Sequence, residues 1–116
     1  MELKEQVTSL ESSERLKELG VVQRSIFFWE LHSSSIPELV FVKVGKIVYA
    51  IENEYISAFT VAELGEMLPV YIRTYRVDDG FICSQKQFTK NANTFEDTEA
   101  EARAKMLIYL LEKKLI

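Results

Sequence analysis

The sequence predicts a single α+β domain spanning residues 1–116, with three helices and an antiparallel sheet of about five strands. Three segments begin with a Thr-x-x-Glu pattern, which caps helices, and continue with apolar residues at helical spacing. Between them, short segments alternate in polarity as strands do, and two of these contain residues typical of hairpin turns. A chain of 116 residues has the length of one domain, because two halves would each lack an adequate core.

The first helix is predicted near residues 9–19. Thr8 and Glu11 form a capping box, the sparse apolar positions are Leu10, Leu16 and Leu19, and Gly20 is placed to end the helix. The segment SIFFWEL, residues 25–31, then alternates as a strand does, with apolar residues on both faces.

Two hairpins are predicted to follow. Residues 38–52 suit a two-residue turn at Gly45-Lys46. In residues 70–85, a turn through Asp78-Asp79 with Gly80 left-handed opposes Val77 to Phe81, whereas a slipped Asp79-Gly80 turn mixes polar and apolar residues on both faces. The preferred register places five residues on the core face: Tyr71, Tyr75, Val77, Phe81 and Cys83.

The middle and last helices are predicted near residues 60–68 and 98–114. Thr60 with Glu63, and Thr98 with Glu101, form their capping boxes. Acidic residues around the start of the last helix face the positive end of its dipole. We expect the middle and last helices to pack on one face of the sheet, because their apolar stripes have no other large apolar surface to cover. The stripe of the last helix comprises Ala100, Ala104, Leu107, Leu111 and Leu115.

The composition argues against several functional classes. The net charge is −4, and no run of basic residues exceeds Lys113-Lys114, so a general nucleic-acid binder is not expected. The longest apolar run, MLIYLL, is far shorter than the roughly 20 residues of a membrane helix. A single cysteine precludes an internal disulfide, and the N-terminus has no signal-peptide core, so we expect a cytoplasmic protein.

No arrangement of residues in the sequence predicts an enzyme. Cys83 would need a base to act as a nucleophile, and His32, the only imidazole, lies in a different predicted element. One histidine cannot build a histidine-rich metal site, and the acidic residues near the last helix lack calcium-loop spacing. We therefore expect a non-enzymatic protein with no metal and no cofactor.

Two candidate surfaces emerge. The wide apolar circumference of the last helix and the aromatic strand predict an interaction surface, used by a homodimer or a dedicated protein partner. A basic and aromatic surface near Tyr71 and Tyr75 is the alternative, as a nucleic-acid site. The first surface comprises Phe28, Trp29, Met106 and Leu110, and the second Arg73, Arg76, Lys86 and Lys90.

Three segments carry a resemblance to a known group of proteins: SLESSERLKELGVVQRSIFFWEL, AFTVAELGEMLP and TEAEARAKMLIYLLEKKLI. Together they resemble small, uncharacterised, phage- or prophage-associated proteins of gut Bacteroidetes, similar to phage ABA-sandwich domains. The resemblance covers about half the chain. It implies a layered α/β fold and an accessory or interaction role, and it implies no catalytic residue. From residue 61, the predicted order of elements also resembles double-stranded RNA-binding domains, although the last helix begins with the acidic TEAEAR.

Overall fold

The chain forms an α+β fold in the computed structural model, which describes residues 2–31, 36–41, 54–85 and 93–116. A short helix precedes the three predicted ones, and the strands form two sheets, so the prediction of three helices and one sheet of about five strands is wrong in detail. The described elements are α1 (Leu3–Gln6), α2 (Leu10–Glu18), β1 (Phe27–Leu31), β2 (Glu38–Phe41), β3 (Glu54–Ala58), α3 (Val61–Met67), β4 (Ile72–Val77), β5 (Gly80–Gln85), β6 (Asn93–Glu96) and α4 (Glu99–Glu112).

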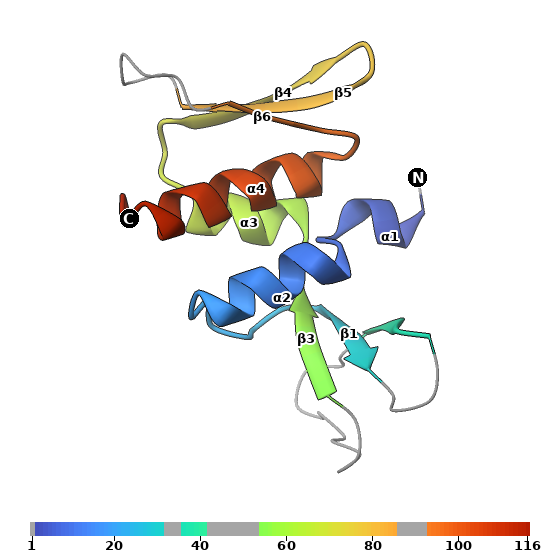
Figure 1. Ribbon diagram of the computed structural model, residues 1–116. Coiled ribbons are helices and arrows are strands. Elements are labelled where there is room, and N and C mark those ends of the chain that lie inside the picture. The colour runs from blue at the N-terminus through green and yellow to red at the C-terminus, as the bar shows by residue number, and fades with distance from the viewer. Residues whose placement is uncertain (1, 32–35, 42–53, 86–92) are drawn as a thin grey trace.

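Two antiparallel three-stranded sheets, ordered β2-β1-β3 and β4-β5-β6, lie on opposite sides of the helices (Figure 1). Helix α4 packs across β4-β5-β6, as predicted for the last helix on a sheet face, whereas the middle helix, α3, lies beside α4 and packs mainly against it (Figure 1). Helix α2 lies between α4 and β3. The strands before α3 pair only with one another, and so do the strands after it, so two sheets form in place of one. The layers give an elongated molecule of 48 × 31 × 26 Å.

Thr8 does not cap α2. It forms hydrogen bonds with Phe59 and Trp29 that hold the N-terminal segment against β1 and the end of β3. Ser9 is the N-cap, and its hydroxyl accepts a hydrogen bond from the amide of Ser12. Thr8 is fully buried and exchanges two hydrogen bonds with the backbone of Phe59: its amide donates to the Phe59 carbonyl, and its hydroxyl accepts from the Phe59 amide. The indole of Trp29 donates to the Thr8 carbonyl at 2.9 Å. The predicted capping box failed because burial gave Thr8 other partners.

The starts of α3 and α4 follow local capping chemistry. Both hydrogen bonds of the capping box between Thr60 and Glu63 are present, and Pro69 follows the end of α3, as predicted. In α4 only half of the box forms. Thr98 accepts from the amide of Glu101, but the Glu101 carboxylate turns away toward α2.

The apolar side chains of α4 form the centre of the core. Leu107 is 2% exposed and packs with Leu16 of α2 and Leu64 of α3, both fully buried. The predicted stripe is confirmed at Leu107 but not at Leu115, which is 52% exposed because α4 ends at Glu112.

The second hairpin adopts neither predicted register. Asp78 and Asp79 form a two-residue turn, so Val77 pairs with Gly80. Shortening the loop by one residue moves Tyr75 from opposite Cys83 to opposite Ile82, which reverses the face of every β4 residue relative to β5. Gly80 does not adopt the predicted left-handed conformation.

Of the first predicted hairpin, only residues 38–41 and their pairing with β1 are described, and the predicted Gly45-Lys46 turn lies outside the described residues.

Candidate functional site

The face of the β4-β5-β6 sheet that points away from α4 carries a row of apolar side chains. Tyr75, Ile82 and Phe95 lie directly opposite one another on the three strands. Tyr75 is 46% exposed and Phe95 is 53% exposed. The other face is turned to the helices, since the Thr94 hydroxyl donates to the Ala102 carbonyl at 2.7 Å. We call the side turned away from α4 the outer sheet face. Gly80 and Ser84 on it are buried, and its members are Arg73, Tyr75, Val77, Gly80, Ile82, Ser84, Asn93 and Phe95.

No described helix or strand covers this face (Figure 1). Antiparallel sheets often leave one face to solvent, but that face is normally polar. Here, its central row consists of two aromatic rings flanking an isoleucine. Large aromatic side chains are enriched where proteins bind one another, because they bury much area at little entropic cost.

Gly80 explains how Phe95 is held on the outer sheet face. A Cβ atom at Gly80 would lie 3.3 Å from Cε2 of Phe95 and 2.5 Å from the Glu96 carbonyl oxygen. The Phe95 ring therefore leans over the bare backbone of the glycine. One edge of the ring is supported by the sheet while about half of the side chain remains in solvent.

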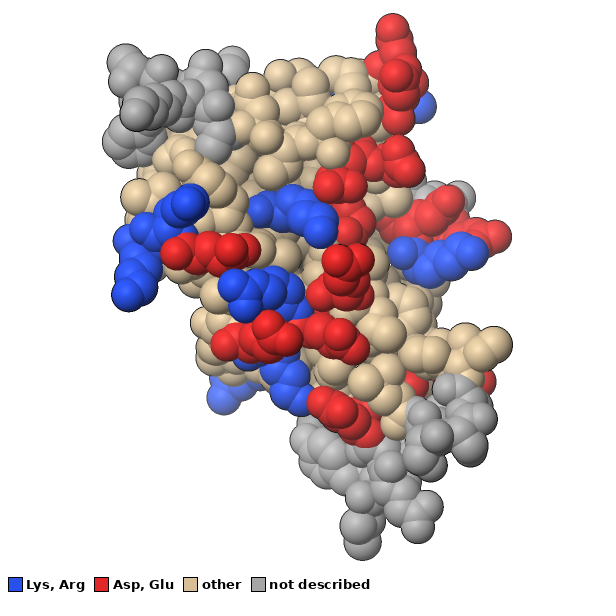
Figure 2. Space-filling model, viewed as in Figure 1, with Lys and Arg blue, Asp and Glu red and all other residues tan. Residues whose placement is uncertain are grey.

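The outer sheet face has opposite charges at its two ends. Arg73, two residues before Tyr75, is exposed at one end of the sheet. At the other end lie Asp78 and Asp79 in the β4–β5 turn and Asp97 just after β6, all exposed. Figure 2 shows acidic side chains gathered at this turn. The face is thus basic at one end, apolar in the middle and acidic at the other end.

The predicted nucleic-acid surface is not assembled among the described residues. Arg73 lies opposite Ser84 on the outer sheet face, whereas Arg76 lies opposite Phe81, whose side chain packs against the core. The two arginines therefore belong to opposite faces, because strand side chains alternate. The other two predicted members, Lys86 and Lys90, lie outside the described residues.

The predicted interaction surface lies largely inside the chain. Met106 and Leu110 are fully buried, since α4 is enclosed by α2, α3 and the β4-β5-β6 sheet. Phe28 is 7% exposed. Trp29 is half-buried, with its indole engaged by the Thr8 carbonyl. The apolar side chains around α4 thus pack against other elements of the same chain. Met106 and Leu110 have no exposed surface.

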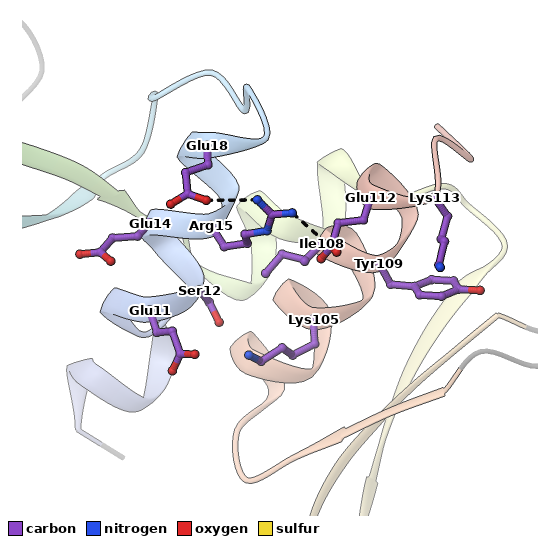
Figure 3. A pocket seen from close by; sticks show the side chains of 10 residues that line it. All are labelled: Glu11, Ser12, Glu14, Arg15, Glu18, Lys105, Ile108, Tyr109, Glu112 and Lys113. Atoms are coloured by element: carbon purple, nitrogen blue, oxygen red, sulfur yellow. Dashed lines mark hydrogen bonds and ion pairs between the residues drawn. The ribbon is translucent and has the colours of Figure 1, made fainter.

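A groove of about 480 Å³ runs between α2 and α4 (Figure 3). Arg15 lies at its centre and contacts Glu18 at 3.1 Å and Glu112 at 3.6 Å. Ile108 supplies an apolar patch, and acidic and basic side chains otherwise intermingle along both helices (Figure 2). Because Arg15 at its centre is already paired with Glu18 and Glu112, we interpret this groove as a solvent-filled gap between the two helices.

The thiol of Cys83 is enclosed in the core. Cys83 is fully buried, and desolvation raises the pKa of the thiol, which disfavours the nucleophilic thiolate. The Thr74 hydroxyl lies 3.8 Å from the sulfur. His32, the only candidate base, lies outside the described residues.

The part of the chain that the structure describes has neither a metal-binding cluster nor a membrane-spanning helix. It holds no group of three or more His, Cys, Asp or Glu side chains arranged to bind a metal ion. None of its helices has both the length and the apolar character needed to cross a membrane.

The three segments SLESSERLKELGVVQRSIFFWEL, AFTVAELGEMLP and TEAEARAKMLIYLLEKKLI contain α2, β1, α3 and α4. The helices α2, α3 and α4 contribute residues to the hydrophobic core, and none of these elements is part of the outer sheet face. Comparisons of the chain with protein-family models, with curated proteins and with solved structures found no match.

Proposed function

We propose that this chain is a non-enzymatic protein-interaction module that docks through the outer sheet face. The observation that supports this proposal is the row of Tyr75, Ile82 and Phe95, whose two aromatic side chains are exposed on a three-stranded sheet with α4 packed behind it. A preformed aromatic surface binds with little loss of side-chain freedom. In keeping with the phage-related resemblance, we propose an accessory role in the cytoplasm of the cell.

A nucleic-acid-binding module is the alternative. Tyr75 and Phe95 are exposed aromatic rings on which bases could stack, and Arg73 lies two residues from the first ring. The order α3-β4-β5-β6-α4 is also the one noted for double-stranded RNA-binding domains. The carboxylates of Asp78, Asp79 and Asp97 oppose this alternative, because they would repel phosphates at one end of the face.

Site-specific photo-crosslinking tests the proposal. A benzoylphenylalanine replaces Phe95 in one variant and Val70, which is fully exposed in the segment before β4, in a control variant. We expect protein adducts from position 95 and none from position 70. Adding Tyr75→Asp to the position-95 variant should remove them. If position 95 forms no protein adduct, the proposal is wrong.

Titration with single- and double-stranded oligonucleotides over a salt series tests the alternative. A nucleic-acid module would bind with an affinity that falls steeply with salt, because cations are released from the phosphates. It would also lose affinity in Arg73→Ala and Tyr75→Ala. The protein-interaction proposal instead predicts weak binding that these two substitutions leave unchanged.

A further inference from the structure

We infer that the partner of the outer sheet face is a second copy of this chain, stacked face to face with its strands antiparallel. This inference rests on the proposed function and names the partner of the same surface. Three features carry it: an apolar row across the middle of the face, opposite charges at its two ends, and the absence of a described element over it.

The charge distribution makes the face complementary to itself. Arg73 and the group of Asp78, Asp79 and Asp97 lie at opposite ends of the strands, with the apolar row between them. A two-fold axis along the row exchanges the two ends of the sheet. Each copy of the row then packs against the same row of its partner, and Arg73 of each copy lies over the acidic end of the other. An isologous dimer needs this kind of self-complementary patch.

The other face-to-face arrangement is disfavoured by the same charges. A two-fold axis parallel to the strands leaves each end over the same end of the partner, so the carboxylates of the two copies meet. Like charges placed together at an interface disfavour association. Of the two arrangements, the antiparallel one is therefore selected.

Among the described residues, the four charged side chains have no ion-pair partner that would compete with this pairing. Neither Arg73 nor Asp78, Asp79 or Asp97 makes an ion pair within the described residues. Arg76, also near the acidic end, projects from the opposite face. Each charge can therefore turn to a partner at little cost.

The dimensions of the face set the strength of the dimer. Strands of six residues are roughly 20 Å long, and three strands at their normal spacing are roughly 14 Å wide. This footprint is smaller than the roughly 800 Å² per partner of a standard stable interface. We therefore expect a weak dimer whose population depends on concentration, driven by the apolar row and oriented by the charged ends.

Sedimentation velocity over a concentration series tests the inference on the full chain. The wild type should move from 13.4 kDa toward twice that mass as concentration rises. Tyr75→Asp with Phe95→Asp should remain monomeric, while the matched surface change Val70→Asp should behave as the wild type does. Circular dichroism melts of each variant verify that it is folded, which is expected because the replaced side chains are exposed.

Charge reversal then tests the antiparallel arrangement. Arg73→Asp makes both ends acidic, and Asp78→Lys with Asp79→Lys makes both ends basic. Each variant alone should associate at least about tenfold more weakly than the wild type, and an equimolar mixture should recover association as a mixed dimer. A wild type that stays monomeric, or a dimer unaffected by these changes, overturns the inference.

These experiments distinguish failure of the dimer inference from failure of the proposed function. If the wild type is monomeric but the photo-crosslinker at position 95 still captures another protein in a Tyr75-dependent way, the dimer inference fails and the proposed function stands. If neither self-association nor an adduct is seen, both fail. Oligonucleotide binding that is lost in Arg73→Asp would overturn the dimer inference in favour of a nucleic-acid partner.

Discussion

Glu101 of α4 accepts a hydrogen bond at 2.9 Å from the hydroxyl of Ser12, in the first turn of α2. Its second carboxylate oxygen accepts from the amide of Ser9 at 2.6 Å. The carboxylate of Glu101, in the first turn of α4, thus accepts a hydrogen bond from the amide of Ser9, which lies just before α2. These contacts join segments about 90 residues apart and fix α2 against α4.

Removing this contact should destabilise the fold. We expect Glu101→Ala to lower the free energy of unfolding by about 2 kcal/mol, because hydrogen bonds to a charged group in a partly buried place contribute about 1.5–3 kcal/mol. Glu101→Gln should cost less, since its one carbonyl oxygen can keep one of the two bonds. Urea unfolding measures both, with the exposed Glu11→Ala as control. Equal losses for Glu11 and Glu101 would contradict this assignment.

The centre of the core should be sensitive to truncation in α4. Leu107→Ala should cost about 2–5 kcal/mol, because it removes a buried side chain and leaves a cavity. Leu115→Ala should cost less than about 0.5 kcal/mol, because Leu115 lies beyond the helix and is 52% exposed. Thermal melts of the two leucine variants provide a matched comparison, and similar losses would contradict the described packing.

Gly80 should not tolerate a side chain even though its backbone is not left-handed. A Cβ atom there would lie 2.5 Å from the backbone carbonyl of Glu96, so β5 and β6 would have to separate. We expect Gly80→Ala to cost about 1–3 kcal/mol by overpacking. Asp79→Ala, in the exposed turn beside it, is the control and should be close to neutral. Chemical unfolding of both variants measures the difference.

Glu96 should make stability depend on pH. Burial raises the pKa of its carboxyl above the ordinary value of 4.5, with Glu101 and Asp97 adding to the effect and Lys105 opposing it. The folded state thus holds this proton more tightly than the unfolded chain does. The resulting stabilisation is present below the ordinary pKa and is lost as pH rises through the raised folded value.

We therefore expect Glu96→Gln to raise the melting temperature at pH 7, because an uncharged amide avoids the cost of a partly desolvated carboxylate. The gain over the wild type should shrink toward pH 4, where the native carboxyl is protonated. Melting curves from pH 4 to pH 8 measure it. A gain that stays constant across this range would show that titration of Glu96 is not its cause.

Helix positions could be predicted from the sequence because capping acts over three or four residues. The boxes at Thr60 and Thr98, and the apolar spacing in α4, place two helices close to where the structure has them. The uncovered aromatic row could not be predicted. It depends on the length of a single turn, and moving from a three-residue to a two-residue loop carries Tyr75 from the expected core face to the outer one.

The tertiary structure decided which distant groups meet. Thr8 and Glu101 both sit in capping patterns, yet each is diverted to a partner far along the chain, at Phe59 and at Ser9 with Ser12. Capping and periodicity depend on neighbours in sequence, so they can be predicted locally. Strand pairing, register and buried polar contacts depend on which surfaces collapse together, because a buried polar group must find a partner wherever the fold places one.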